Sequence, residues 1–236
     1  MSLALSEFAR LVSYGNAYLS RGYDLRGATG AAIDPQAQRW KFEILTARRS
    51  FPLQTVARSP QSWFRWLQGM HYGTLMLVPL GHPYLGIAAA GDGAPMLWDE
   101  WRRQQAGIYQ TGPMTFDLRG SDAEAAVTQP RVPSLAAMIE RLDPLLQSAS
   151  ALAPDDAEAF DRARRALHAS HPALPARTSL FPPLSYVLDV RRAAAAIDAM
   201  YEAGSRYSFR DPGPPRPEGY GTTMIEAIVA AVNAAA

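Results

Sequence analysis

The sequence predicts an α+β fold, with a small mixed or antiparallel sheet in its N-terminal half and a mostly helical C-terminal half. Strand-like apolar runs, separated by glycine and proline, lie between residues 40 and 90. From residue 133 on, apolar residues recur at helical spacing instead. The 236 residues are expected to form a single α+β domain over 1–236; the alternative is a sheet-containing domain over 1–130 followed by a helical domain over 131–236.

The N-terminal half is predicted to open with a helix and four strands. Apolar residues at helical spacing predict an amphipathic helix over 6–19. The strands are predicted from alternation, or from short apolar runs bounded by turn residues, over 40–47, 51–57, 73–80 and 85–90. Glycine and proline in the Gly81-His82-Pro83-Tyr84 segment predict a turn between the last two strands.

A weak internal repeat suggests a duplicated strand–helix–strand unit. Residues 59–69 and 94–104 share the pattern P-x-x-W-x-x-W. Pro60 and Pro95 would each occupy the first position of a helix, where proline is favoured. Residues 91–94 are then expected to form a strand-to-helix loop.

The C-terminal half is predicted to be a series of helices. The periodic segments cover 134–143, 155–168 and 184–203, with a last helix from residue 223. Asp143 and Pro144 are expected to end one helix and begin the next, with aspartate as the cap and proline at the first position. Thr223 and Glu226 have the T-x-x-E spacing of a capping box.

Composition excludes several classes of function. The formal net charge of +1 gives no basic excess of the kind that binds phosphate backbones, so no nucleic-acid partner is expected. The absence of cysteine excludes disulfides, a thiolate nucleophile and cysteine-ligated metals. No cofactor is predicted. The alanine, proline and arginine content, with Lys41 as the single lysine, indicates the GC-rich coding of many bacteria.

No membrane segment is expected, and a soluble protein is predicted. The N-terminus lacks the basic and continuous apolar regions of a signal peptide, so a cytoplasmic location is expected, or a periplasmic one if a leader was trimmed. An uncharged run extends from Trp66 to Gly91, but Pro79, Pro83 and several glycines interrupt it. Buried strands and turns therefore explain this run better than a membrane-spanning helix.

Four tryptophans are the first binding candidates. On two predicted helices they form pairs at i,i+3 spacing, so each pair would lie on one face: Trp63, Trp66, Trp98 and Trp101. They are expected to anchor a core, because tryptophan buries a large area. Alternatively they line an aromatic groove for a partner, since tryptophan is enriched in binding hot spots.

Histidines and an aspartate give weak catalytic candidates. His71 and His82 flank a predicted strand and Asp92 follows the next one, so a histidine–aspartate acid–base pair is conceivable. No nucleophile motif accompanies them, and turn residues are the simpler interpretation. His168 and His171 form H-x-x-H without a further ligand at metal-binding spacing, so no metal site is predicted.

A proline-rich connection over 205–221 supplies the remaining binding candidates, Arg210, Arg216 and Tyr220. A partner could recognise it as an extended polyproline arm, or it wraps over the core and leads into the last helix. The basic run at 162–165 is expected to be solvated surface.

The sequence therefore leaves two classes of function open. The first is a non-enzymatic binding or accessory module with a protein partner, as in an immunity, adaptor or chaperone-like role, acting through the tryptophans and the 205–221 connection. The alternative is a small-molecule enzyme using His82, His71 and Asp92. Exposure of the tryptophans would favour the first; convergence of the three polar residues on a pocket would favour the second.

Overall fold

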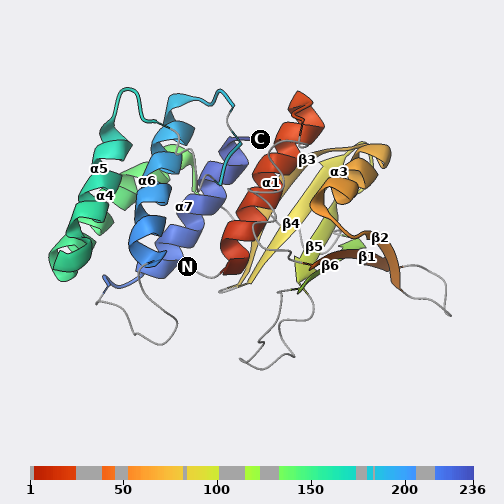
Figure 1. Cartoon of the computed structure of the whole chain (residues 1–236), viewed down its shortest axis with the longest axis horizontal. Coiled ribbons are helices and arrows are strands. Elements are labelled where there is room, and N and C mark those ends of the chain that lie inside the picture. The colour runs from red at the N-terminus through yellow and green to blue at the C-terminus, as the bar shows by residue number, and fades with distance from the viewer. Residues whose placement is uncertain are drawn as a thin grey trace. The chain divides into compact units, whose positions relative to one another are not determined.

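The computed structural model confirms the α+β class (Figure 1). It describes residues 3–24, 39–45, 53–81, 84–100, 115–122, 133–173, 180–182, 184–205 and 216–236. Its contacts divide the chain into two compact units. We call them the sheet unit, residues 10–130 with residue 236, and the helical unit, residues 131–235 with 1–9. The single-domain organisation over 1–236 stays a prediction.

The described residues of the sheet unit form one mixed six-stranded sheet. Its strands are β1 (Arg39–Leu45), β2 (Leu53–Ala57), β3 (Tyr72–Gly81), β4 (Tyr84–Gly91), β5 (Met96–Glu100) and β6 (Thr115–Asp122). They lie in the order β2-β1-β6-β5-β4-β3. Only β1 and β6 pair in parallel, and every other neighbouring pair is antiparallel. The four strands predicted between residues 40 and 90 are therefore confirmed.

Helix α3 (Pro60–Gly69) supplies aromatic rings to the core of the sheet unit. Ser59 caps it through the Ser62 N–H, and Pro60 occupies its first turn as predicted. Its Trp63 ring stacks on Phe42 of β1, with the centroids 4.5 Å apart. Trp98 of β5 meets Trp63 edge-on at 5.3 Å. All three rings are fully buried, so they contribute area burial as well as favourable ring geometry.

One edge of the sheet is covered by helix α1 (Leu3–Arg21), which was predicted over 6–19. Asn16 Nδ2 donates to the Leu75 carbonyl oxygen at 2.8 Å, and the Leu75 N–H donates to Asn16 Oδ1 at 2.7 Å. The buried Asn16 carboxamide thus forms hydrogen bonds with both the N–H and the carbonyl of Leu75 on the edge strand β3. A Cβ at Gly15 would come too close to the Leu75 side chain and to the Phe64 ring, so a larger residue there would force these side chains to move. The arrangement protects this edge from pairing with another strand.

The predicted second helix of the repeat is wrong. Residues 96–100 form strand β5, so the 91–94 segment joins two strands and the strand–helix–strand unit is not duplicated. Trp98 lies opposite Ile87 of β4 and opposite Gly120 of β6. Because β5 pairs on both sides, sheet hydrogen bonds outweigh the helical spacing of its tryptophans.

The helical unit contains α4 (Leu135–Leu152), the short 3₁₀ helix η1 (Pro154–Asp156), α5 (Ala157–His168), α6 (Leu188–Ser205) and α7 (Tyr220–Ala234). Each α-helix overlaps a predicted helical segment. Ser150 near the end of α4 contacts Asp161 early in α5, whereas Asp143 contacts His168 at the end of α5. The two helices are therefore antiparallel neighbours.

Two predicted helix boundaries are wrong. Asp143 and Pro144 do not separate two helices, because α4 continues through them and buries one continuous stripe of side chains: Met138, Leu142, Leu146 and Ala149. Helix α7 begins three residues before Thr223, after Gly219 in the left-handed conformation (φ 73°). Glu226 forms no capping box and pairs with Arg141 of α4 at 2.9 Å. Packing between helices outweighs the local cap signals in both places.

Among the residues that the structure describes, no helix combines the length and apolar character needed to cross a membrane.

Candidate functional site

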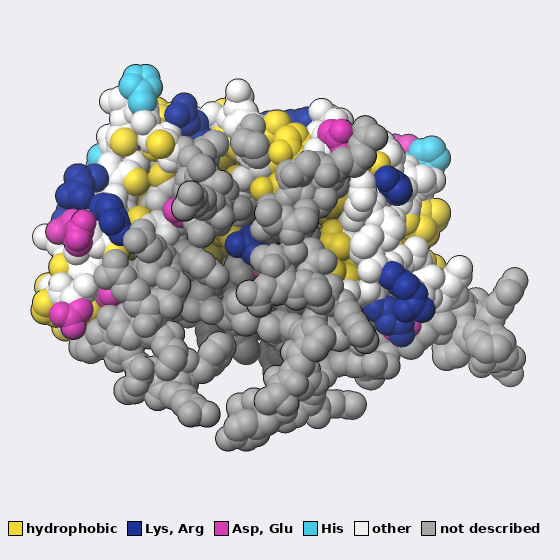
Figure 2. All heavy atoms as spheres, in the orientation of Figure 1, with side chains coloured by type: hydrophobic (Ala, Val, Ile, Leu, Met, Phe, Trp, Pro, Cys, Tyr) yellow, Lys and Arg dark blue, Asp and Glu magenta, His cyan; other side chains and the backbone are white. Residues whose placement is uncertain are grey.

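A polar stripe runs along α5. Its members recur at i, i+3, i+4 and i+7 and so share one face of the helix: Asp161, Arg164, Arg165 and His168. The opposite face is apolar and buried: Ala159, Phe160, Ala163 and Leu167. In Figure 2 basic and acidic side chains gather over this helix. Burial of the apolar face therefore orients the polar stripe toward solvent.

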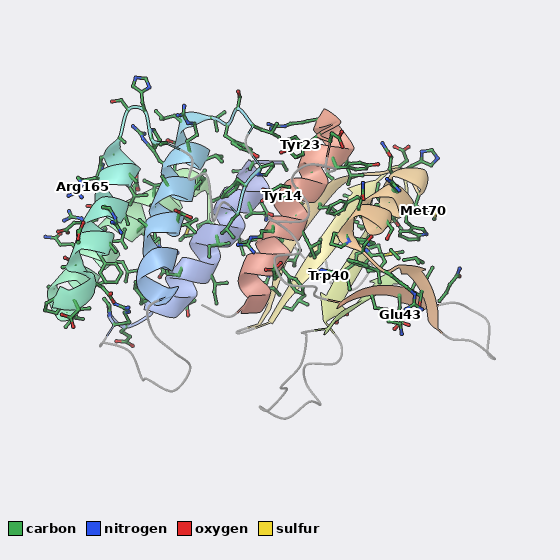
Figure 3. All side chains as sticks on the ribbon, in the orientation of Figure 1. Tyr14, Tyr23, Trp40, Glu43, Met70 and Arg165 are labelled. Atoms are coloured by element: carbon green, nitrogen blue, oxygen red, sulfur yellow. The ribbon has the colours of Figure 1, made fainter. Side chains whose placement is uncertain are left out.

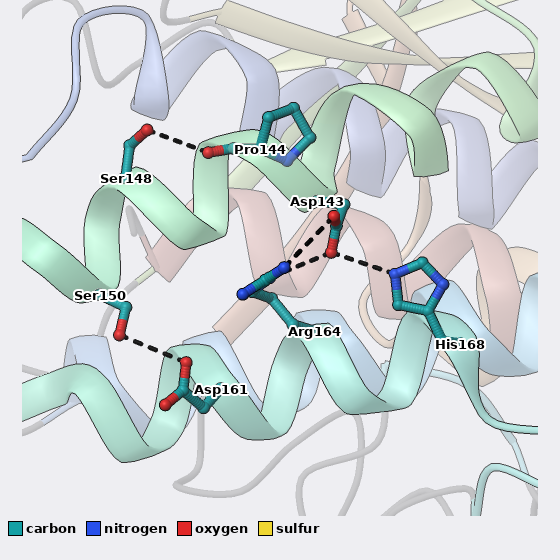
Figure 4. A network of polar contacts seen from close by, with 7 residues as sticks. All are labelled: Asp143, Pro144, Ser148, Ser150, Asp161, Arg164 and His168. Carbon is teal, nitrogen blue, oxygen red and sulfur yellow. Dashed lines mark hydrogen bonds and ion pairs between the residues drawn. The ribbon is translucent and has the colours of Figure 1, made fainter.

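Asp143 of α4 joins this stripe (Figure 4). Arg164 Nε donates to Asp143 Oδ1 at 3.1 Å, and its Nη2 lies 3.5 Å from Oδ2. His168 Nε2 is 3.1 Å from Asp143 Oδ1. The hydrogen bond from Arg164 holds the pKa of the Asp143 carboxyl below its usual range; partial burial opposes this and the His168 contact supports it. Asp143 thus accepts two charged or polar partners as a carboxylate.

The stripe lines an open, shallow pocket of about 520 Å³, which we call the α5 pocket. Its lining residues are Asp161, Arg164, Arg165 and His168. Asp161 is held by a hydrogen bond from Ser150 Oγ at 3.3 Å. Arg165 is exposed and projects from α5 (Figure 3), and no residue in the described part of the chain pairs with its guanidinium. The pocket therefore combines a free cation with a cation already bound to Asp143.

The sequence predictions missed this site. They placed residues 162–165 on solvated surface and, for His168 with His171, predicted no metal site. The signal is the pattern D-x-x-R-R-x-x-H over 161–168, which puts four polar side chains on one helical face. Asp143 lies on a different helix, and only the fold brings it to Arg164 and His168. No group of three or more metal-ligating side chains is found in the described ranges.

The catalytic candidates show only a partial convergence. The Asp92 N–H donates to the His71 carbonyl oxygen at 3.3 Å, so these two residues lie at the same corner of the sheet unit. Both side chains are exposed there. Gly81, the last residue of β3, lies at the opposite end of that strand from His71. His82 lies outside the described residues.

The backbone conformation of His71 is explained by the end of helix α3. His71 is in the left-handed region (φ 61°) immediately after the cap of α3, and its N–H donates to the Gln68 carbonyl. That conformation commonly terminates helices. A Cβ at Gly91 would collide with the His71 carbonyl oxygen, so the tight approach of β4 requires a glycine there. Helix termination accounts for the backbone of His71 without a catalytic role.

The tryptophan candidates divide by exposure. Trp63 and Trp98 are fully buried, which matches the core interpretation and leaves no ring surface for a partner. Trp66 is partly exposed and meets the Trp98 ring edge-on at 5.7 Å. Trp101 lies outside the described residues. No aromatic groove is formed by the three described rings.

The described residues of the proline-rich connection are held inside the helical unit. Arg216 Nη2 donates to Asp156 Oδ2 at 2.9 Å, and its guanidinium lies 4.9 Å from the centre of the Phe160 ring. Burial raises the pKa of the Tyr220 phenol, and its ring lies 5.6 Å from the same guanidinium. Arg210 lies outside the described residues.

The lowered pKa of Asp143 predicts an acid-sensitive contribution to stability. A carboxyl whose pKa falls on folding stabilises the native state above its unfolded pKa, near 3.8 here, and loses that effect as pH drops through the folded pKa. We expect Asp143→Asn to destabilise the chain at pH 7 and the difference from wild type to shrink on acidification below about pH 4. Urea unfolding at both pH values measures this. Arg164→Gln should show the same trend, and a difference that does not vary with pH would contradict the assignment.

Comparison of the chain with models of known families, with curated proteins and with solved structures finds no match.

Proposed function

We propose that this chain is a non-enzymatic protein-binding module and that it contacts its partner through the α5 pocket. The observation that supports this most directly is Arg165, an exposed guanidinium at the rim of the pocket with no partner in the part of the chain that the structure describes. Arginine is enriched in binding hot spots because its planar fork bonds strongly to oxygen acceptors.

The shape of the α5 pocket favours contact with a protein surface. Small-molecule sites are typically concave, largely apolar and enclose most of their ligand. The α5 pocket is open and is lined by charged and polar side chains. It therefore suits a side chain of a partner better than an enclosed substrate.

The enzyme alternative has less support. His71 and Asp92 share a corner through a backbone hydrogen bond, but no hydrogen bond joins their side chains among the described contacts. General acid–base catalysis requires the side chains themselves to reach the substrate, and a backbone hydrogen bond does not position them for that. The α5 pocket lies in the helical unit, whereas His71 and Asp92 belong to the sheet unit.

A charge-reversal experiment tests the proposed function. Tagged wild-type chain, Arg165→Glu and the matched control Arg65→Glu are used to capture proteins from a lysate of the source organism. Arg65 is also exposed and unpaired in the described structure, but lies on α3. We expect a stoichiometric partner with wild type and Arg65→Glu, and its loss with Arg165→Glu, since a repulsive charge at a contact costs several-fold or more in affinity.

Two outcomes contradict the proposal. Equal capture by all three proteins would show that the α5 pocket is not the contact. Loss with both arginine variants would indicate a general effect of net charge. Circular dichroism of each variant establishes that its fold is retained.

A further inference from the structure

We propose that the α5 pocket is an oxyanion site, which binds a carboxylate or phosphoryl group of the partner, and that Asp143 limits its affinity by occupying part of the same set of donors. This inference rests on the proposed function, because it names the chemical group that the pocket recognises.

Two of the residues that line the pocket already bind one carboxylate. Arg164 and His168 together hold the Asp143 carboxylate, which is the contact that an external acidic group would make (Figure 4). Arginine presents five N–H donors in a planar fork, and its pairing with carboxylate or phosphate oxygens is frequently bidentate. The internal pair therefore demonstrates the recognition chemistry of this face of α5.

Donors remain after Asp143 is satisfied. Arg164 uses Nε and Nη2 on Asp143, which leaves Nη1 without a contact to that carboxylate. Arg165 uses none of its donors within the described structure and lies at i,i+3 from His168 on the same helical face. These groups line one pocket, so a ligand with two or three oxygens can meet more than one of them.

The charges of α6 also favour an anion at this end of α5. The C-terminus of a helix carries partial negative charge on its free carbonyl groups, which opposes an anion. Two arginines of α6 compensate at this end: Arg192 Nε donates to the Ala169 carbonyl at 3.0 Å, and Arg191 Nη2 to the Pro172 carbonyl at 2.7 Å. The Ala169 carbonyl caps the end of α5 and the Pro172 carbonyl lies three residues further on, so each of these two oxygens is paired with an arginine.

Two carboxylates lie near these donors, and they differ in how they affect an incoming anion. Asp161 lines the pocket but lies at i−4 from Arg165, on the side away from His168, and is bonded to Ser150. Asp143 is bonded directly to two of the donors. Removing its charge frees the Arg164 guanidinium and His168 for an external group. Asp143→Asn should therefore bind an oxyanion more tightly than wild type does, whereas Arg165→Gln should bind it more weakly.

Direct titration tests this inference. The full chain is titrated at constant ionic strength with inorganic phosphate and, separately, with a tetraglutamate peptide, and binding is followed by nuclear magnetic resonance. We expect affinity to fall about fivefold in Arg165→Gln and to rise about fivefold in Asp143→Asn, the range of a partly exposed charge pair. Arg65→Gln should match wild type. Tighter binding of phosphate identifies a phosphorylated partner, and tighter binding of the peptide identifies an acidic segment.

The inference is overturned if neither probe binds wild type or Asp143→Asn, or if Arg165→Gln binds as well as wild type. Its failure differs from failure of the proposed function. Capture of a partner that depends on Arg165, without binding of either probe, removes the oxyanion inference and leaves the protein-binding role. Probe binding that depends on Arg165, without any captured partner, supports the anion site and removes the protein-binding role.

Discussion

Trp98→Ala is expected to lower the free energy of unfolding by about 3 to 5 kcal/mol, the cost of removing a large buried aromatic side chain and leaving a cavity. The Trp98 ring is fully buried and meets Phe42, Trp63 and Trp66 at centroid distances of 6.1, 5.3 and 5.7 Å. Its strand β5 pairs on both sides, so the sheet cannot readily collapse into the vacated space. Urea unfolding followed by circular dichroism measures the change without relying on tryptophan fluorescence.

Trp98→Phe separates packing from hydrogen bonding. No described residue accepts a hydrogen bond from Trp98 Nε1, so replacing indole by phenyl removes ring volume and no hydrogen bond. We therefore expect Trp98→Phe to lower the free energy of unfolding clearly less than Trp98→Ala does. Met70→Ala, at a side chain that is 51% exposed on the C-terminal cap of α3, should cost little. An unchanged free energy of unfolding in Trp98→Ala would contradict the core assignment.

Trp98 also shows why local sequence pattern alone did not predict strand β5. The repeat P-x-x-W-x-x-W occurs twice, but its first copy is helix α3 and its second contains strand β5. Ser59 supplies a side-chain cap to the first copy, whereas the second follows the turn after β4 and pairs with β4 and β6. Partners of β5 near residues 87 and 120 decide its conformation, and no window around residue 98 contains that information.

Long periodic segments were predicted more reliably than their ends. The helices α1, α4, α5, α6 and α7 and the strands β1 to β4 all occur where the apolar spacing placed them. The errors at Pro144 and Thr223 arose because a local cap signal was weighed above the continuity of a buried stripe. At Pro144, side chains buried on both sides of the proline hold one helix, whose packing compensates for the missing N–H.

The candidate site was less predictable than the fold. Its stripe on α5 is visible in the spacing of Asp161, Arg164, Arg165 and His168, but such stripes are common on solvated helices. What distinguishes this stripe is the contrast between Arg164, which is paired with Asp143, and Arg165, which is not. That contrast depends on the packing of α4 against α5. The sequence alone therefore shows the charges but not which of them are already satisfied.

Arg216→Ala is expected to lower the free energy of unfolding by about 3 to 5 kcal/mol, because it leaves an uncompensated buried charge. Asp156 has no exposed side-chain surface, and the ion pair with Arg216 is the contact that compensates its Oδ2. Asp156 Oδ1 has no hydrogen-bond partner among the described residues, so the carboxylate has little other support. The substitution also removes the guanidinium that lies over the Phe160 ring.

The loss in free energy of unfolding should differ between removal of Arg216 and removal of Asp156. Arg216 retains 24% of its side-chain surface in contact with solvent and can hydrate its charge when Asp156 is removed, whereas Asp156 cannot. We therefore expect Asp156→Ala to cost less than Arg216→Ala. The double variant Asp156→Leu with Arg216→Met should recover most of the loss, since an apolar pair of similar volume can replace a buried ion pair. Urea unfolding of the two alanine variants and this apolar pair measures all three effects.

These results also decide between the two interpretations of the proline-rich connection. If Arg216 were chiefly a contact for a partner, as one reading of the sequence allows, Arg216→Ala would weaken capture of that partner and leave unfolding unchanged. If it anchors the start of α7 to η1 and α5, unfolding changes and the apolar pair restores it. The buried carboxylate, the aromatic ring beneath the guanidinium and the 2.9 Å contact all favour the anchor. On that basis partner binding is expected to depend on Arg165, whose charge is free, and not on Arg216, whose charge is already used within the fold.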